Sequence, residues 1–423
     1  MGFKNKSTFL LIIGLLIGAL SGYQLGANGF RPTLKANLSQ VNIINSNSPE
    51  NVDFAEYWKV WDILQESHIF RDKISANDML AGSLKGLASS FDDPYTHYLD
   101  TEENQVLTET IEGKYSGIGA ELGEKDNNIV VVAPLDDSPA KKAGLKAGDF
   151  ILSVDKVSVI GMSINEVVNM IRGEKGKEVV LQVIKEKETA PREIKIIRDE
   201  IRIDSVRWED KGEGIAYIRV SRFGTNTNAE WNSIVDKILT DIGPSKLKGV
   251  IVDVRQDPGG VLNSAIHLAS EFLDKDVAVI WEETADGVQT AYNSSRKGKF
   301  KDLDLNIVVL TDEGSASASE ILAGALRDEA GAVLVGAKTF GKGTIQESIQ
   351  LGNNDALNVT IAKWLTPKKQ WVHKDGLVPD IEVKIPDDFK VGDVDPQLAK
   401  AMELAKMEKQ SFIQNILEKV KAL

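Results

Sequence analysis

Residues 311–320 (TDEGSASASE) combine nucleophilic hydroxyl groups with a local pattern that could use them. The segment follows an apolar run and opens an alanine-rich stretch, which predicts a turn from a buried strand into a helix. Such a turn presents side chains and free N–H groups at the positive end of the helix dipole, where an oxyanion is stabilised. The competing interpretation is a serine-capped helix start without chemistry, because serine is a favoured N-cap.

A nucleophilic serine needs a base, and here lysine is a better candidate than histidine. Residues 340–344 (FGKGT) place Lys342 between two glycines, directly after the apolar run 332–335. A lysine accepts a proton only if burial lowers its pKa from about 10.4 to about 7–8. Gln346, four residues on, lies on the same side as Lys342 in a strand or a helix and could hold the amine. The alternative interpretation of Lys342 is a surface turn.

The elements around these two segments predict an α/β layer domain. Apolar runs occur at 215–220, 250–254, 277–281, 307–310 and 332–335, and helical patterns at 229–239, 264–273 and 315–328. Near-continuous apolar strands that alternate with helices are typical of a sheet covered by helices. The last stretch, 395–423, predicts one more charged amphipathic helix.

The upstream residues have a different character. Helical spacing of apolar residues runs through 54–104, with a second helix expected from about 77 to 91. From 113 to 199 short β-branched runs predict strands, and Ser163 with Glu166 forms a capping-box pattern before a helix. Residues 31–50 are polar and predict a linker.

The first thirty residues predict export. Lys4 and Lys6 precede an apolar core over residues 9–20, and no further charge occurs until Arg31. This pattern is typical of a secretory signal or of a retained membrane anchor, and both remain open beside a buried core helix. Because the lysines stay on the near side of the membrane, we expect the bulk of the chain to be extracytoplasmic, in the periplasm or at the cell surface.

Composition excludes several functional classes. The chain has 423 residues, 50 Lys and Arg against 63 Asp and Glu, and a net charge of −13. A protein this acidic is not expected to bind nucleic acid generally. The absence of cysteine excludes disulfides, thiolate metal sites and a cysteine nucleophile. With only four histidines, a histidine-rich metal site is not expected either.

Three segments within 113–199 resemble a PDZ domain of the bacterial protease-associated type. They are GIGA at 117–120, AGL at 143–145 with GD at 148–149, and IRG at 171–173. Such domains bind a peptide C-terminus by strand addition, and N–H groups of a glycine-containing loop bind the carboxylate. The resemblance implies a peptide-binding loop made of Gly117, Ile118, Gly119 and Ala120, where a plain glycine-rich hairpin is the alternative.

The chain as a whole resembles the carboxyl-terminal processing proteases, which are serine proteases of the S41 family with a Ser/Lys dyad. The matching segments are SFDDPYTHYL at 90–99, DPGG at 257–260, GSASASEI at 314–321, FGKGT at 340–344, DG at 375–376 and PD at 379–380. They occur in family order over residues 50–385, and the 25-residue spacing from serine to lysine also matches. One departure is Asp257, where the family more often has asparagine.

The resemblance assigns roles by position. Ser317 is the implied nucleophile, Lys342 the general base and Gln346 the residue that orients the base. N–H groups of Ala318 and of the Gly259-Gly260 turn would form the oxyanion hole. No metal or cofactor is implied.

The implied fold is a PDZ domain inserted between an N-terminal helical segment and a crotonase-like α/β protease domain. The predicted domains are a signal or anchor at 1–30, a linker at 31–50, a helical segment at 51–112, the PDZ domain at 113–199, the protease domain at 200–390 and a C-terminal helix at 391–423. The implied substrates are proteins with flexible apolar C-terminal tails. The membrane would be a partner only through an uncleaved N-terminal segment, and a homo-oligomer is compatible with these features.

Arg172 is predicted either to couple peptide binding to activation or simply to stabilise a helix C-terminus. Asp328 lies about 16 Å along a regular helix from Ser317, so we expect a structural ion pair rather than a catalytic role. The alternative functions are a catalytically silent PDZ adaptor and, from fold analogy alone, an acyl-CoA hydratase or isomerase.

Overall fold

The computed structural model describes residues 30–34, 41–45, 53–125, 128–135, 137–185, 188, 190–386, 389, 393–409 and 411–412. The predicted signal or anchor lies outside these residues, apart from Phe30, and so does the chain after 412. The chain divides into two units, Met1–Gly82 and Ser83–Leu423, and each is described by itself. In the described part of the chain, no helix has the length and apolar character needed to cross a membrane.

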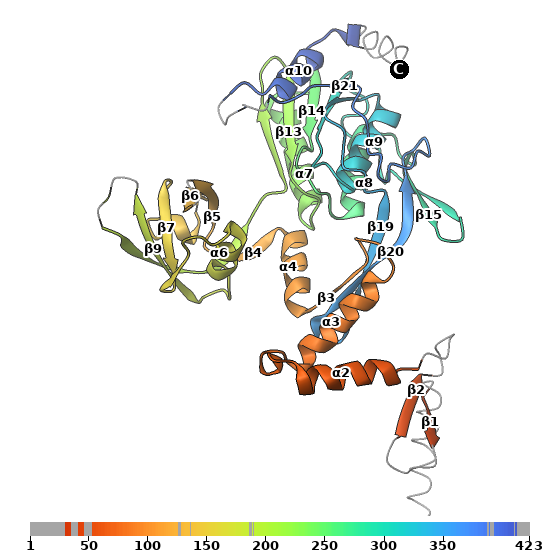
Figure 1. Ribbon diagram of the computed structural model, residues 1–423. Helices are drawn as coiled ribbons and strands as arrows, with labels where there is room; N and C mark the ends of the chain where they lie inside the picture. The colour runs from red at the N-terminus through yellow and green to blue at the C-terminus, as the bar shows by residue number, and fades with distance from the viewer. Residues whose placement is uncertain are drawn as a thin grey trace, which may run out of the picture. The chain divides into compact units, whose positions relative to one another are not determined.

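The first unit contains a hairpin and two helices (Figure 1). Strands β1 (Phe30–Leu34) and β2 (Val41–Asn45) pair antiparallel within the stretch predicted as a linker. Helix α2 (Ala55–Ser67) follows, then a 3-10 turn η1 (Arg71–Lys73), and α3 (Ala76–Ser89) begins in this unit. No side chain of α2 is buried, although its sequence is rich in aromatic residues.

The second unit begins with a strand and a well-capped helix. Strand β3 (His97–Leu99) leads into α4 (Thr101–Glu112), whose capping box joins Asp100 and Glu103. Gly113 ends the helix in the left-handed conformation (φ 68°), as a C-terminal glycine commonly does. Sequence periodicity predicted helix throughout this region, but β3 pairs with a distant strand, β20, and that pairing is invisible to local patterns.

The domain predicted as PDZ is a five-strand path with two short helices (Figure 1). Its strand order is β10-β9-β7-β6-β5, and β8 (Val157–Ser158) pairs with β7. The strands are β5 (Ala120–Lys125), β6 (Asn128–Pro134), β7 (Asp149–Val154), β9 (Glu178–Lys185) and β10 (Arg192–Ile197). The helices are α5 (Pro139–Lys142) and α6 (Ile164–Ile171), and α6 begins with the predicted Ser163–Glu166 capping box.

A separate two-stranded ribbon carries the chain into and out of this domain. Strand β4 (Lys114–Gly117) enters it, β11 (Asp199–Arg202) leaves it, and the two pair antiparallel. The PDZ core is its own cluster of buried side chains, which includes Val131, Leu181 and Val183. The inserted domain therefore has its own hydrophobic core, and the two strands of the ribbon connect it to the rest of the chain.

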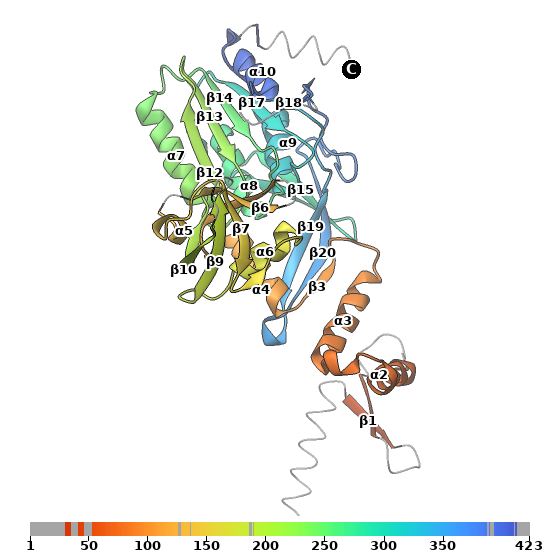
Figure 2. The same cartoon turned by 60° about the vertical axis from the view of Figure 1, so that its left-hand side comes forward.

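The α/β domain is built on a mixed six-stranded sheet with the order β12-β13-β14-β17-β18-β21 (Figure 2). Its strands are β12 (Val206–Asp210), β13 (Ile215–Val220), β14 (Gly249–Asp253), β17 (Asn306–Thr311), β18 (Val333–Gly336) and β21 (Ile381–Glu382). All pairs are parallel except β12 with β13. The carboxyl ends of the parallel strands therefore meet at one edge.

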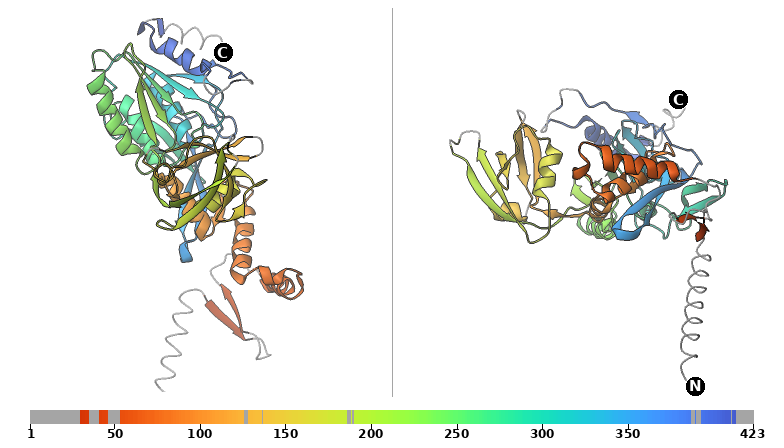
Figure 3. Two further views of the ribbon diagram at one scale, coloured as in Figure 1. Left: turned by 90° about the vertical axis from the view of Figure 1, so that its left-hand side faces the viewer. Right: turned by 60° about the horizontal axis from the view of Figure 1, so that its bottom comes forward.

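Alternate residues of these strands fill two cores. Val250, Val252 and Val309 face the helices α7 (Thr227–Asp241), α8 (Leu262–Ala269) and α9 (Ala318–Ala330). On the other face, Ile251 and Val308 pack against α10 (Pro396–Ala405), dark blue in Figure 3. Burial on both faces explains why the strands are continuously apolar in sequence.

A second sheet, with the order β16-β15-β20-β19, lies in the same unit. It consists of β15 (Ala278–Thr284), β16 (Gln289–Asn293), β19 (Thr344–Gln350) and β20 (Ala356–Leu365), and β3 pairs with β20. This sheet brings residues 97–99 beside the strand hairpin that follows Lys342. It thereby joins two segments that are 250 residues apart in the chain.

The predicted C-terminal helix is interrupted within the described residues, because residues 406–408 are not helical and helical residues occur again at 409 and 411–412. α10 ends at Ala405, whereas the sequence pattern predicted one helix from 395 to 423. The buried side chain of Asn306 donates to the carbonyls of Leu404, Ala405 and Met407, with the bond to Met407 at 2.7 Å. Because these carbonyls are satisfied by a residue of β17, the helix stops there for a tertiary reason.

Candidate active site

Ser317 lies at the strained junction between a buried strand and a helix. β17 ends at Thr311, and α9 begins directly after Ser317, whose φ of 56° and ψ of −113° are unusual for a residue with a side chain. Strain of this kind exposes a side chain at the tip of a strand–turn–helix unit. The arrangement is the one that residues 311–320 predicted.

Only one of the three alternating serines has a hydroxyl that donates to no acceptor among the described residues. The Ser315 hydroxyl donates to the carbonyl of Val254 at 2.8 Å, and the Ser319 hydroxyl to that of Asp257 at 2.8 Å. Both therefore hold the serine turn against the segment after β14. Ser317 is left with a hydroxyl proton free for chemistry.

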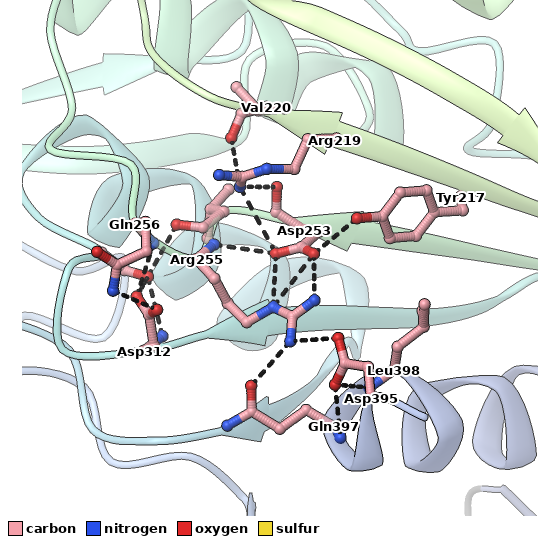
Figure 4. A network of polar contacts seen from close by, with 12 residues as sticks. Tyr217, Arg219, Val220, Asp253, Arg255, Gln256, Asp312, Asp395, Gln397 and Leu398 are labelled. Atoms are coloured by element: carbon pink, nitrogen blue, oxygen red, sulfur yellow. Dashed lines mark hydrogen bonds and ion pairs between the residues drawn. The ribbon is translucent and has the colours of Figure 1, made fainter. Parts of the chain in front are cut away.

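Hydrogen bonds to the loop that follows β14, at the edge of the sheet, also hold the serine turn. The Asp312 carboxylate accepts the backbone N–H and the side-chain amide of Gln256, each at 2.7 Å (Figure 4). It also accepts the N–H of Gly314 at 3.0 Å. The turns after β14 and β17 are thus bonded to each other.

The Asp257–Gly260 turn packs directly on Ser317. A Cβ atom on Gly259 would lie 2.9 Å from the Ser317 Cβ and 2.6 Å from the Ala316 carbonyl oxygen, so only glycine fits there. Gly260 is equally crowded by the Phe223 carbonyl, at 2.0 Å. These contacts explain why two adjacent glycines follow Pro258.

The N–H groups of this turn are not equivalent. That of Gly259 already donates to the Asp257 carboxyl at 2.9 Å. In the part of the chain that the structure describes, those of Gly260 and Ala318 have no acceptor. Of the predicted oxyanion-hole residues, these two carry the free donors, and their role stays a prediction.

Lys342 lies in a tight loop between β18 and β19. A Cβ on Gly341 would come within 2.8 Å of the Gly376 nitrogen, and one on Gly343 within 2.7 Å of the His373 nitrogen. The glycines on both sides of Lys342 therefore let segment 373–376 pack against the loop. Lys342 is not in a solvated surface turn, because its side chain is largely buried.

Glu320 joins the serine turn to the lysine loop. Its carboxylate is completely buried, and one oxygen accepts the N–H of Ser317 at 2.8 Å and that of Lys342 at 2.9 Å. The other oxygen accepts the N–H of Gly341 at 2.8 Å and the hydroxyl of Thr339 at 2.5 Å. One side chain thus holds both candidate catalytic residues by their backbones.

The Lys342 amine lies over the ring of Tyr95, 4.7 Å from its centre. Burial lowers the pKa of Lys342, and the nearby carboxylates of Asp93 and Glu320 oppose that shift. No hydrogen bond joins the amine to the Ser317 hydroxyl in the described residues. Catalytic hydrogen bonds are often long or absent in unliganded enzymes and tighten when substrate binds.

Gln346 is anchored near the lysine loop but does not bond to the amine among the described residues. Its amide nitrogen donates to the hydroxyls of Thr344 at 2.9 Å and Thr360 at 3.0 Å. A β-bulge between Ile345 and Gln346 changes the strand alternation on which the sequence argument relied. Its orienting role stays a prediction.

The predicted peptide-binding loop borders a cavity of about 680 Å³ in the PDZ region. The N–H groups of Ile118 and Gly119 have no acceptor among the described residues. The loop and the apolar side chains of α6 and its surroundings line the cavity: Gly117, Ile118, Gly119, Ala120, Leu122, Leu135, Ile164, Val168 and Ile171. Charged side chains also line the cavity: Glu121, Arg172, Arg202, Asp204 and Arg207.

Arg172 lies at the C-terminus of α6 and also lines this cavity. Its guanidinium stacks on the ring of Tyr115, 4.9 Å from the ring centre, and its Nε is buried without a partner. Tyr115 belongs to the connecting ribbon. Arg172 therefore contacts the ribbon, while its regulatory role stays a prediction.

Asp328 forms the structural ion pairs expected of it. Its buried carboxylate lies 3.7 Å from the Arg327 and Lys368 nitrogens and accepts the Lys368 N–H.

The described residues contain no cluster of three or more His, Cys, Asp or Glu side chains that could hold a metal ion.

Glu320, Asp93 and Tyr95 are the site residues that the sequence analysis did not single out. Ser317 and Glu320 form a Ser-x-x-Glu capping-box pattern, which could have indicated the N–H bond to Glu320. Asp93 and Tyr95 lie in the matching segment 90–99, but nothing local indicates that this segment reaches Lys342, because the contact depends on the pairing of β3 with β20.

Comparisons with known proteins find matches in both the α/β domain and the inserted domain. Residues 214–383 match the model of peptidase family S41, and residues 130–185 match that of the PDZ domain. The carboxy-terminal processing protease CtpB of Bacillus subtilis is 34% identical over 337 residues, covering 79% of this chain and 68% of the relative. CtpA of the same organism is 35% identical, covering 76% and 67%.

Among solved structures, the photosystem II D1 C-terminal processing protease matches 84% of this chain and 92% of its own, with 24% identity and a TM-score of 0.48. The two family models lie inside the α/β domain and the inserted domain described above. The predicted fold class, a PDZ domain with an α/β protease domain, is confirmed. The chain therefore belongs to peptidase family S41, as a serine peptidase related to the carboxy-terminal processing proteases.

Proposed function

We propose that this chain is an extracytoplasmic endopeptidase that cleaves proteins near flexible, apolar C-terminal tails with a Ser317–Lys342 dyad. Ser317 attacks the substrate carbonyl while neutral Lys342 accepts its proton. Lys342 then returns the proton to the leaving amine, and water hydrolyses the acyl-enzyme. The extracytoplasmic location follows from the apolar, lysine-flanked N-terminal sequence alone.

The bridge made by Glu320 carries this proposal. The Glu320 carboxylate accepts from the N–H groups of both Ser317 and Lys342. It therefore holds the serine turn next to the lysine loop, although these two residues are 25 positions apart in the sequence. No observation on the described residues favours an adaptor or a hydratase.

The oxyanion would form next to the start of α9. The free N–H groups of Gly260 and Ala318 flank Ser317, and the helix dipole adds positive potential there. The Gly259 N–H contributes indirectly, because its bond to Asp257 fixes the turn.

Acid should inactivate the enzyme through protonation of Lys342. Because burial lowers the pKa of Lys342, kcat/KM should rise with pH along a limb below pH 10.5. The Tyr95 ring favours the ammonium form, so Tyr95→Leu should move this limb to lower pH by about 0.5–1 unit. Tyr95→Phe, which keeps the ring, should leave it in place. An unmoved limb in the leucine variant would contradict a contact between ring and amine.

Tail recognition is tested with peptides that differ only at the C-terminus. Replacing the free carboxylate with an amide should raise KM about tenfold or more, because charge-assisted bonds to the Ile118 and Gly119 N–H groups are lost. A peptide with an apolar last residue should be cleaved faster than one ending in lysine. Cleavage is followed by mass spectrometry with the full chain.

A pair of glycine variants locates this recognition. Gly119 and Gly161 both have positive φ, but only at Gly119 would a Cβ meet neighbouring atoms, at 2.6 Å from the Ser138 Cβ. Gly119→Ala should therefore raise KM for tail peptides, and Gly161→Ala should not. Equal KM values for the free-acid and amide peptides would argue against carboxylate binding.

A further inference from the structure

Asp257 is a fully buried carboxyl group in the turn that touches the nucleophile. None of its surface is exposed. Its backbone carbonyl accepts the Ala316 N–H at 3.0 Å and the Ser319 hydroxyl at 2.8 Å. The turn therefore bonds to the chain on either side of Ser317, at Ala316 before it and at Ser319 in α9 after it, and any charge on Asp257 acts on the reacting centre at close range.

The two carboxyl oxygens of Asp257 have different surroundings. Oδ1 accepts the Gly259 N–H at 2.9 Å, whereas Oδ2 is buried and has no partner. An ionised carboxylate needs donors at both oxygens, and burying it with one oxygen unpaired is unfavourable. A neutral acid keeps the bond from Gly259 to its carbonyl oxygen, and burying its unpaired O–H group costs less than burying a charge.

The charged groups around Asp257 do not compensate for its burial. Arg219 and Arg222, from β13 and the residues after it, favour ionisation. Arg255 is engaged with Asp253, and Glu320, on the packed helix, bonds to the lysine loop. Burial outweighs the Gly259 N–H bond, the nearby Ser319 hydroxyl and the two arginines, and it raises the pKa of Asp257 to about 7.

We propose that Asp257 is a positioning residue that supports catalysis only as a neutral acid, holding the Gly259-Gly260 turn without placing negative charge beside the oxyanion. This inference rests on the proposed roles of Ser317, Gly260 and Ala318. When Asp257 loses its proton, its charge repels the oxyanion that forms on the substrate carbonyl. Activity therefore falls as pH rises through the pKa of this carboxyl.

The test compares kcat/KM between pH 5 and 10 for the full-length wild type, Asp257→Asn and Asp380→Asn, on one tail peptide. The wild type should give a bell-shaped profile, with the acid limb set by Lys342. Asp257→Asn, neutral at every pH, should lose the alkaline limb. At pH 9, about two units above the wild-type pKa, it should exceed the wild type by up to about 100-fold.

Asp380→Asn is the matched control. Asp380 is also buried, with a raised pKa and a backbone N–H bond, from Leu334 at 2.8 Å. It lies directly before β21 and bonds to β18 rather than to the turn on Ser317. Its variant should keep the alkaline limb of the wild type.

An alkaline limb that persists unchanged in Asp257→Asn would overturn the proposal, and so would loss of activity at every pH in a folded variant.

A second measurement does not depend on turnover or on the variant's activity. Infrared spectra of the wild type should show a protonated carboxyl C=O band at pH 5–6 that disappears near pH 7–8 and is absent from Asp257→Asn. Absence of that band from the wild type would show an ionised Asp257 and reject the idea. Failure of the proposed dyad is recognised separately, as cleavage that survives Ser317→Ala.

Discussion

Ser317→Ala should lower kcat for tail peptides by at least about 10⁴-fold, because no other serine of the turn can replace its hydroxyl. The hydroxyls of Ser315 and Ser319 instead donate to backbone carbonyls of the segment that follows β14. Tail binding should change less than twofold, since the PDZ cavity is built from different residues. Cleavage is measured by mass spectrometry and binding by fluorescence polarisation of a labelled tail peptide.

Three further variants complete this prediction. Lys342→Met should reduce kcat about as strongly as Ser317→Ala, and the double variant should be no worse than either, because residues that act as one unit are not additive. Ser319→Ala should keep most of the activity, since only the bond to Asp257 is lost. Additive losses in the double variant would contradict a dyad, and full activity of Ser317→Ala would favour an adaptor.

Local patterns in the sequence were sufficient for much of the α/β domain. The run 215–220 is β13 with the same bounds, and Ser163 with Glu166 begins α6 as their spacing predicted. These elements are determined by burial of alternate faces and by satisfaction of N–H groups within four residues. Both causes act between residues that are close in the sequence, so the elements that they determine can be predicted from the sequence.

Other features depend on contacts between distant residues and could not be predicted in this way. β3 exists because it pairs with β20, and α10 ends because Asn306 caps it from another strand. The same applies to the site, where Tyr95 reaches Lys342 over 247 residues of chain. The predicted dyad thus depended on family resemblance, while its supporting residues emerge only from the folded structure.

Glu320→Gln should lower kcat about 10²-fold or more while leaving tail binding unchanged. Its carboxylate accepts three backbone N–H groups and one hydroxyl, and an amide keeps only one accepting oxygen. Whichever oxygen is replaced by NH₂, at least one buried N–H group loses its acceptor, which costs about 1–3 kcal/mol and lets the two loops separate. The measurement is kcat together with the free energy of unfolding in urea.

The control variant Glu271→Gln distinguishes a role of Glu320 in positioning Ser317 and Lys342 from a general loss of folding stability. Glu271 is equally buried, 1% exposed, and accepts from Arg296 and the Lys299 N–H, each at 2.7 Å, but it contacts neither catalytic loop. Its variant should lose similar stability and keep its kcat below the unfolding transition. Glu320→Gln should add nothing in the Lys342→Met background, because it acts through that lysine and Ser317. If both glutamine variants lower kcat alike, Glu320 stabilises the fold and does not position the dyad.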